Sequence, residues 1–335
     1  MQPVSAQEPP TALMKVPPPP SVAVQAVECC DVCGASQHRP FASGYDYELE
    51  TCSNLWHFVC CETCEHVWLH PRPAVQALQT IYPPHYYAYN YDQQIGALLR
   101  WGKAALDRRK LAKILGLLAR PPRSYLDIGC GNGRFLKVME QRGLSRHALH
   151  GLELSAPVVE HLAAQGYRVF NTRVEDCHSI SSGSIDLITM FHVIEHVDAP
   201  GAVIERLADW LAPGGTIALE TPNLDSLDAR MFREHFWGGY HIPRHWHLFA
   251  ARTLSRLLER AGLKVDAVRY QPGHSFWLYS LHHRLKYGRR PRPRLARRFD
   301  PFQALLPLVA ATGFDIARAT LGFKTSAMLV IATKR

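Results

Sequence analysis

The chain of 335 residues lacks an uninterrupted apolar run of the length, about 18 residues, that crosses a bilayer as a helix. Its longest apolar stretch, residues 304–314, is broken by Pro307 and Gly313. Residues 1–20 are rich in proline and lack the apolar centre of a secretory signal. No Gly-Lys-Ser or Gly-Lys-Thr triplet is present, which argues against a loop that binds nucleoside triphosphates. From these absences we expect a cytoplasmic protein without a spanning helix.

Cysteine is nearly absent after residue 65, since seven of the nine cysteines precede it. Two Cys-x-x-Cys pairs, Cys30 with Cys33 and Cys61 with Cys64, would converge on one ion and form the closed tetrahedral thiolate shell of a structural zinc site. The three other early cysteines leave the register of the pairs open, and free or partly disulfide-bonded thiols are the alternative. The clustering favours a metal and a reducing compartment.

Acidic residues are absent from residues 284–298, which hold eight arginines and lysines and account for most of the net charge of +9. The rest of the chain is nearly balanced, so a nucleic-acid-binding body is not indicated. An apolar, helix-like stretch follows at residues 302–309. A basic run beside an amphipathic stretch is one pattern of peripheral contact, here of residues 284–314, with an anionic membrane surface or a lipid-linked substrate. We favour the alternative, a pocket lid with a solvated basic loop.

The glycine-rich segment that begins at Tyr125 organises the central part of the chain. Residues 125–128 read as a buried strand, Gly129, Gly131 and Gly133 form a loop, and a helix begins at about Arg134. The glycines permit a tight turn, close approach of a ligand to the backbone, and close packing of helix on strand. Two acidic residues end neighbouring strands, Asp127 and Glu153, and a carboxylate at the second position could hold ribose hydroxyls. The segment therefore predicts a nucleotide-like cofactor.

Strand and helix patterns alternate from residue 125 onward, which predicts an α/β fold with a Rossmann-like, doubly wound, seven-stranded sheet. The last strand should be antiparallel and close the sheet. The expected strands are 125–128, 148–154, 167–170, 185–190, 216–220, 264–270 and 327–333.

Three motifs resemble those of the class I S-adenosylmethionine (SAM) dependent methyltransferases. They are the Asp-x-Gly-x-Gly-x-Gly loop, the Glu-His-Val turn after the fourth strand, and the Pro-Gly-Gly turn before the fifth. The resemblance implies a cofactor site in which His192 stands near the methionine part of SAM. It also implies that the backbone of Val174 and the side chain of Glu175 or Asp176 meet the adenine. It further assigns the loop and the end of the second strand to the cofactor: Asp127, Gly129, Cys130, Gly131, Gly133, Glu153 and Leu154. In the related ubiquinone-pathway O-methyltransferases the post-strand-four turn can hold a divalent ion. His192 replaces one acid here, so a metal at that turn is not favoured.

The segments on either side of this domain resemble a narrower group, the bacterial SAM methyltransferases of glycan and natural-product pathways. A zinc-ribbon-like segment is followed by Pro-Arg-Pro at 71–73 and a tyrosine cluster at 82–91, and Pro243-Arg-His comes later. The tyrosines could line a substrate entrance or pack the ribbon onto the main domain. The resemblance implies a small-molecule, sugar or lipid-linked acceptor. Because a hydroxyl acceptor benefits from a base, His245 and His196 are the catalytic candidates, with a structural role as the alternative.

We divide the chain into a disordered Pro-rich tail at 1–27, a zinc-ribbon-like segment at 28–72, a helical linker or cap at 73–120, and a SAM-binding domain at 121–273. An aromatic and His-rich cover at 221–249 lies within that domain, and a basic and apolar insertion with the final strand occupies 274–335. Two other functions compete with O-methylation of a small acceptor. A nucleic-acid methyltransferase is disfavoured because the Asn/Asp-Pro-Pro-Tyr/Phe motif is absent after the fourth strand. A non-catalytic zinc-ribbon interaction protein would not bind SAM.

Overall fold

The structure, a computed structural model, describes residues 19–83 and 97–335. Most of the predicted Pro-rich tail and most of the tyrosine cluster (Tyr86, Tyr87, Tyr89 and Tyr91) lie outside these residues.

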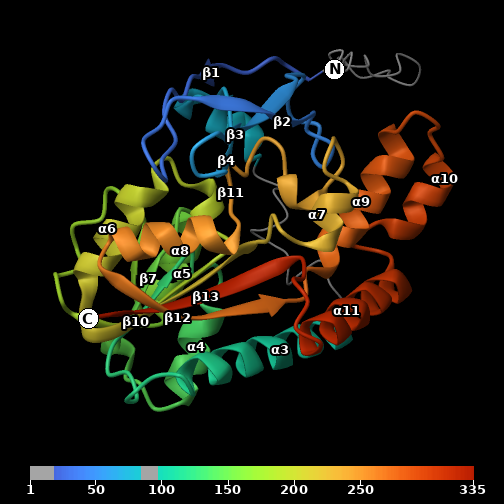
Figure 1. Cartoon of the computed structure of the whole chain (residues 1–335). Coiled ribbons are helices and arrows are strands. Elements are labelled where there is room, and N and C mark those ends of the chain that lie inside the picture. The colour runs from blue at the N-terminus through green and yellow to red at the C-terminus, as the bar shows by residue number, and fades with distance from the viewer. Residues whose placement is uncertain (1–18, 84–96) are drawn as a thin grey trace.

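A seven-stranded sheet forms the centre of the molecule, as the sequence predicts, with the order β12-β13-β10-β9-β6-β7-β8. The central strands β6 to β10 are parallel, and β13 runs antiparallel between β10 and β12. Figure 1 shows β13 in red within the sheet. The strands are β6 (Tyr125–Ile128), β7 (Leu149–Leu152), β8 (Arg168–Phe170), β9 (Ile185–Phe191), β10 (Leu211–Pro222), β12 (Leu263–Gln271) and β13 (Ala327–Lys334).

The fifth strand in chain order, β10, is longer than expected. It begins at Leu211 and includes the predicted Pro-Gly-Gly turn, where its register against β9 shifts between Leu211 and Thr216. Gly214 adopts a φ of 74° there, a conformation that glycine takes without strain. The motif is therefore an irregularity inside β10.

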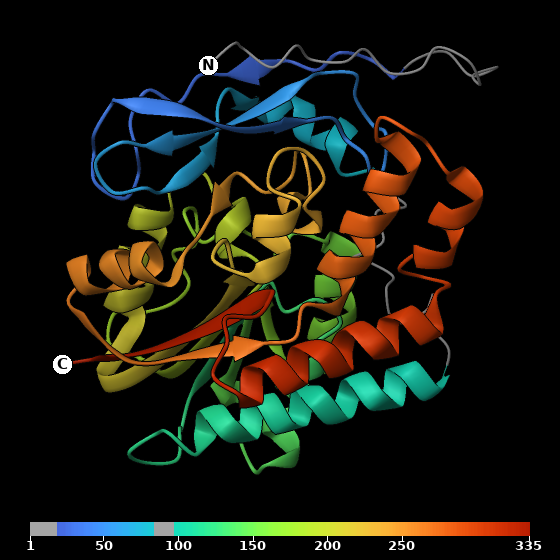
Figure 2. The same cartoon turned by 45° about the vertical axis from the view of Figure 1, so that its right-hand side comes forward.

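Helices cover both faces of the sheet (Figure 2). Their apolar faces form two clusters, one with α6 and α8 and the other with α3, α4 and α5. Positions such as Leu136 and Met139 follow the helical period and are fully buried. The helices are α3 (Ala97–Leu115), α4 (Arg134–Gln141), α5 (Ala156–Ala164), α6 (Pro200–Trp210) and α8 (Ala251–Arg260), with short turns η2 (Arg146–Ala148) and η3 (Ile194–His196).

The zinc-ribbon-like segment forms most of a second sheet above the first, and its own strands are blue in Figure 1. Its order is β11-β4-β3-β2, all antiparallel. The strands are β2 (His38–Gly44), β3 (Trp56–Cys61), β4 (Val67–Leu69) and β11 (His247–Leu248). A separate pair joins β1 (Val24–Gln25) to β5 (Arg72–Pro73), so part of the expected tail is a strand. The turns η1 (Val75–Ala77) and α1 (Leu78–Ile81) follow.

The predicted cover at 221–249 is the segment that joins the two sheets. It contains α7 (Leu227–Met231), η4 (Gly238–Tyr240) and β11, and it packs its aromatic side chains against β3 and β4. The fully buried side chain of Arg244 makes a bidentate ion pair with Asp46, at 3.0 and 2.9 Å. A buried charge is stable only when it is paired and hydrogen-bonded, so this pair holds the cover in register with the ribbon.

The insertion between β12 and β13 consists of α9 (His274–Tyr287), α10 (Pro293–Ala296), η5 (Arg297–Phe299) and α11 (Leu305–Thr320). The buried carboxylate of Asp315 on α11 accepts hydrogen bonds from Gly273 N, Trp277 Nε1 and Ser326 Oγ. It thereby ties α11 to the start of α9 and to the start of β13. No helix in the described ranges is both long and apolar enough to cross a membrane.

Candidate active site

A cavity of about 1500 Å³ lies at the carboxyl ends of β6, β7, β9 and β10, where ligands bind in sheets of this kind. It extends past β13 to the end of β12, and α3, the start of α9 and the last turn of α11 also line it. Ligand sites usually measure about 300–1000 Å³. The cavity is therefore large enough for two molecules side by side.

The glycines of the loop have different environments. A Cβ on Gly129 would lie 2.5 Å from Val193 Cγ2, and one on Gly133 would lie 2.6 Å from Leu162 Cδ2. Gly131, with φ of 49°, lines the cavity, and no atom of residues 19–83 or 97–335 lies within 4 Å of that position. Gly131 therefore leaves room for a ligand against bare backbone, whereas Gly133, which does not line the cavity, lets α5 pack closely.

Glu153 lies directly after β7 and is fixed by backbone N–H groups. Its Oε2 accepts from Gly131 N at 2.9 Å, and its Oε1 accepts from Leu154 N and Ser155 N at 2.8 and 3.0 Å. Both lone pairs of Oε1 are thus used by backbone donors, and Oε2 keeps one lone pair for a hydroxyl donor. Leu154, of which 64% is exposed, forms the adjacent apolar wall. This arrangement fits a ribose diol with its base against Leu154.

Asp127 is buried at the end of β6 and accepts a hydrogen bond of 2.7 Å from Thr189 Oγ1, to which the Tyr125 hydroxyl donates in turn. Burial raises the pKa of Asp127 to about 7. The neighbouring Cys130 thiol also lines the cavity, and burial raises its pKa.

Residues 172–175 form the next part of the wall. Val174 is buried and lines the cavity, where it fits the predicted contact with adenine. The side chain of Glu175 accepts a hydrogen bond from Arg173 Nη2 at 3.0 Å, and Arg173 also pairs with Asp198 at 2.6 Å. Glu175 therefore has a cation as its partner in this structure.

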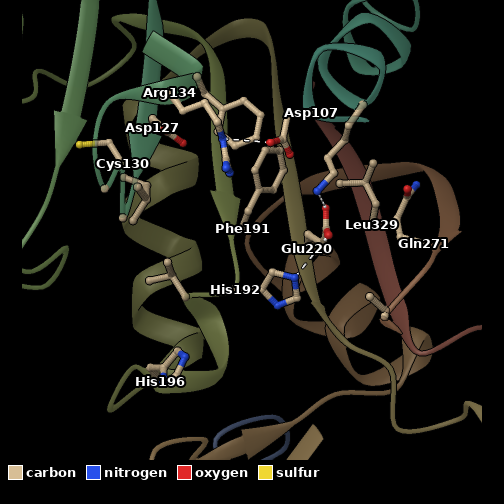
Figure 3. A pocket seen from close by; sticks show the side chains of 18 of the residues that line it. Asp107, Asp127, Cys130, Arg134, Phe191, His192, His196, Glu220, Gln271 and Leu329 are labelled. Carbon is tan, nitrogen blue, oxygen red and sulfur yellow. Dashed lines mark ion pairs between the residues drawn. The ribbon is translucent and has the colours of Figure 1, made fainter. Parts of the chain in front are cut away.

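His192 is one of several charged groups that lie in a row across the cavity (Figure 3). Its Nδ1 lies 3.3 Å from Glu195 Oε1, and its Nε2 lies 3.3 Å from Glu220 Oε1. Lys110 from α3 lies 2.5 Å from the other oxygen of Glu220. Desolvation lowers the pKa of His192, but the hydrogen bonds and charges of the two glutamates outweigh it and raise the pKa to about 9. His192 is accordingly an imidazolium at neutral pH.

The pKa of Glu220 is shifted in the opposite direction. Its burial raises its pKa, but Lys110 and His192 outweigh that effect and lower the pKa to about 2. A second ion pair lies beside the first, with Arg134 Nε 3.0 Å from Asp107 Oδ2 (Figure 3). The middle of the cavity therefore holds two ion pairs and one charged histidine.

The two histidines predicted to be catalytic lie close together, but only one reaches the cavity. His196 lines it, and its Nδ1 donates to the Arg244 carbonyl at 2.9 Å, which leaves the lone pair on Nε2. Burial lowers the pKa of His196 to about 4. His245 is buried outside the cavity lining, donates from Nδ1 to the Gly239 carbonyl at 2.8 Å, and has a pKa well below the ordinary value because of burial.

The same two histidines and Glu195 could hold a metal ion, since one ligand atom from each lies within 4.8 Å of the others. His245 Nε2 is 3.9 Å from Glu195 Oε1. Glu195 Oε2 also accepts a hydrogen bond from Thr221.

Sequence reasoning did not assign roles to Glu220, Lys110, Asp107 or Arg134. Glu220 carried a usable signal, because an acidic residue at the carboxyl end of a central parallel strand faces the ligand crevice. Lys110 and Asp107 carried none, since only the docking of α3 across the sheet brings them to β10 and α4.

The four predicted zinc ligands are brought together by two matching turns. Gly34 N donates to the Cys30 carbonyl, and Glu65 N donates to the Cys61 carbonyl, and both turns end in a positive φ. Cys30 Sγ lies 3.5 Å from Cys64 Sγ, and Cys33 Sγ lies 3.5 Å from Cys61 Sγ. Ligands at about 2.3 Å from zinc would lie about 3.8 Å apart in a tetrahedron. The residues therefore fit zinc, and the other early cysteines are outside the cluster.

The sheet order and the glycine loop define a Rossmann-like cofactor-binding protein. Residues 99–268 match the model of the methyltransferase domain family. Because this match covers half of the chain, the chain belongs to that family, as its motifs predict.

Curated relatives include the ubiquinone biosynthesis O-methyltransferases. That of Xanthomonas campestris pv. campestris is 34% identical over 131 residues, which are 36% of this chain and 51% of the relative. That of Psychrobacter arcticus is 27% identical over 136 residues, 37% of this chain and 49% of the relative. The chain spans about half the length of the curated relatives it matches. A SAM-dependent methyltransferase from Archaeoglobus fulgidus has 17% identity and a TM-score of 0.46, covering 69% of this chain and 94% of that one.

We predict that zinc loading stabilises the ribbon and, through the pairing of β4 with β11, the cover. A strong chelator should release about one zinc ion per chain and speed amide hydrogen exchange in residues 28–70 and in β11, because metal binding supplies much of the folding energy of so small a unit. Cys61→Ser should have the same effect, and Cys29→Ser, outside the cluster, should not. Metal analysis measures the zinc content, and amide hydrogen exchange measures the protection of residues 28–70 and β11. Metal-free protein in which residues 28–70 stay protected would contradict the prediction.

Proposed function

We propose that this chain is a SAM-dependent methyltransferase that methylates an oxygen of a small-molecule acceptor. The observation that carries the proposal is Glu153, held by three backbone N–H groups beside an open Gly131 in a cavity with room for cofactor and acceptor. Family membership and the names of the curated O-methyltransferases support it. Structural zinc at Cys30, Cys33, Cys61 and Cys64 and cytoplasmic localisation belong to the same proposal.

Bound SAM would supply an activated methyl group on a positively charged sulfur. Glu153 would bind the ribose hydroxyls, Gly129, Gly131 and Cys130 would contact the cofactor through the loop, and Leu154 and Val174 would flank the adenine. The main work left to the chain is to position the acceptor and exclude water.

The groups at the centre of the cavity divide into charged and neutral ones. Glu220 and His192 would fix the acceptor by hydrogen bonds, because both keep their charges at neutral pH. His196, neutral and with a free Nε2, would take the acceptor proton, and His245 would hold His196 and Glu195 in place through contact with both.

Binding of S-adenosylhomocysteine tests the cofactor site directly. We expect calorimetry to show one site per chain. Glu153→Ala should weaken binding about tenfold to a hundredfold, since hydrogen bonds to a charged group contribute about 1.5–3 kcal/mol. Glu160→Ala, an exposed change on α5, should leave the affinity unchanged. Absence of binding to the unaltered protein would favour the non-catalytic interaction protein instead.

The roles of the histidines predict a separation of turnover from cofactor affinity. With an acceptor found by screening with methyl-labelled SAM, His196→Ala should lower kcat about a hundredfold or more, as expected for loss of a base. His245→Ala should lower it less, and both should keep their affinity for S-adenosylhomocysteine. His283→Ala is the control, because His283 is also buried with a pKa lowered to about 3 but lies outside the cavity.

The pH profile of kcat/KM should follow the same assignments. We expect activity to fall below about pH 4 as His196 becomes protonated, and above about pH 9 as His192 loses its charge. His192→Gln should remove the upper limb. Normal rates in both His196→Ala and His245→Ala would refute these assignments.

A lipid-linked or glycan acceptor and a peripheral membrane contact are finer parts of the proposal. Six arginines with exposed side chains precede α11, and the first two turns of α11 add exposed Leu306 and Val309. The arginines are Arg289, Arg290, Arg292, Arg294, Arg297 and Arg298. Basic and apolar side chains in this order suit an anionic bilayer surface.

Co-sedimentation with vesicles tests this contact. The protein should bind vesicles of phosphatidylcholine with one third phosphatidylglycerol at low salt, and not pure phosphatidylcholine. Arg292→Gln with Arg294→Gln should weaken binding about 30-fold, from about 1 kcal/mol per charge. Val309→Asp should weaken it as well, and Val75→Asp, where valine is also 58% exposed, should not. No binding to anionic vesicles removes the membrane contact and leaves a lid with a solvated basic loop.

A further inference from the structure

The part of the cavity away from the glycine loop has a floor made by one row of the sheet. Phe191 on β9 pairs with Glu220 on β10, Glu220 with Leu329 on β13, and Leu329 with Arg269 on β12. All four line the cavity, so their side chains lie on one face. Adjacent strands are about 4.8 Å apart, which places Arg269 about 10 Å from Glu220 along the row.

Helix α3 crosses above this row and contributes cations to the same space. Arg109 and Lys113 are one turn apart on α3, so they project from the same side of the helix, and both line the cavity with exposed side chains. Lys110 lies between them in sequence and forms an ion pair with Glu220. Arg109 and Lys113 are thus neighbours of the central ion pairs without being part of them.

The charged groups of the cavity are arranged unevenly. In the described part of the chain, Lys110 pairs with Glu220, Arg134 with Asp107, and Arg173 with Glu175, whereas Arg109, Lys113 and Arg269 have no carboxylate in ion-pair contact. The remaining acids, Asp127 and Glu153, lie at the glycine loop. Of the described residues, the cations without an acidic partner therefore lie on α3 and at the end of β12, whereas the acids without a cation partner lie at the glycine loop.

Apolar side chains separate Arg269 from the central ion pairs and line the walls around the three cations. Leu329 separates Arg269 from Glu220 along the floor, and Leu106, Ile316 and Phe276 from three different helices line the surrounding walls. Such a space suits an apolar ligand body with one anionic end, because the body would pack on the apolar walls and the anion would be attracted by the cations.

We propose that this half of the cavity binds an acceptor that carries an anionic group on an apolar body. The anion would lie among Arg109, Lys113 and Arg269, and the oxygen to be methylated would lie about 10 Å away, beside Glu220 and His192. The assignment of an acceptor rests on the proposed function, but the binding preference can be measured without catalysis.

Two dyes that differ by one sulfonate test the preference in the full-length protein saturated with S-adenosylhomocysteine. Anilinonaphthalene sulfonate is an apolar anion, and phenylnaphthylamine is the same body without the charge. The triple variant Arg109→Gln, Lys113→Gln, Arg269→Gln should weaken binding of the anionic dye at least tenfold and change binding of the neutral dye less than twofold. The matched control Arg108→Gln, Arg142→Gln, Arg256→Gln removes the same charge from side chains outside the cavity lining.

Each result of the dye comparison either supports or overturns the proposed anion site. Selective loss of the anionic dye in the cavity variant alone supports the proposal. Equal losses of affinity for the anionic dye in both triple variants would indicate a general effect of charge. Unchanged affinity in the cavity variant, or equal losses for both dyes, would mean that the dyes bind elsewhere. Any of these results overturns the proposal. If S-adenosylhomocysteine does not bind, the proposed function fails, and the same dye comparison on the protein alone still tests the anion site.

Discussion

The buried ion pair between Arg244 and Asp46 is the interaction on which the rest of the arrangement depends. Burial alone would raise the pKa of Asp46, but Arg244 and Thr51 lower it below its ordinary value. Removing one partner of such a pair costs about 3–5 kcal/mol because the other charge stays buried. The pair fixes the backbone of the cover, and that backbone reaches the cavity: the Arg244 carbonyl accepts from His196, and Trp246 N donates to the Glu195 carbonyl. The ribbon thus orients groups of the candidate active site.

Electrostatics then separates the histidines into two kinds. His192 lies between two carboxylates and is charged at neutral pH, whereas His196 is next to other histidines and a backbone carbonyl and is neutral. The difference arises although the two residues belong to one short turn after β9. Neighbouring groups, more than sequence position, decide which histidine can accept a proton.

Much of the fold could be predicted because its signals are local. The period of apolar residues placed β6, β9 and the start of α4 within a residue, and three closely spaced glycines marked the loop. The cluster of four cysteines was expected from ligand spacing, which left its register open until the fold brought Cys30, Cys33, Cys61 and Cys64 together. The pairing of β11 with β4 could not be predicted, because a strand of two residues has no period and its partner lies 180 residues earlier in the chain. The ion pair of Lys110 with Glu220 could not be predicted either, because the two residues lie on different elements far apart in the chain.

The sequence by itself determined the class of fold, the family, the glycine loop with Glu153, and the four cysteines, since each depends on spacing within one segment or on one strand-loop-helix unit. Only the tertiary structure decided which side chains meet across segments. It placed His196 in the cavity wall and His245 behind it, and it paired Glu220 with His192 and Lys110. Among the described residues it left Arg109, Lys113 and Arg269 without acidic partners. The physical reason is that charge and burial depend on every element packed around a group, and those elements come from distant parts of the chain.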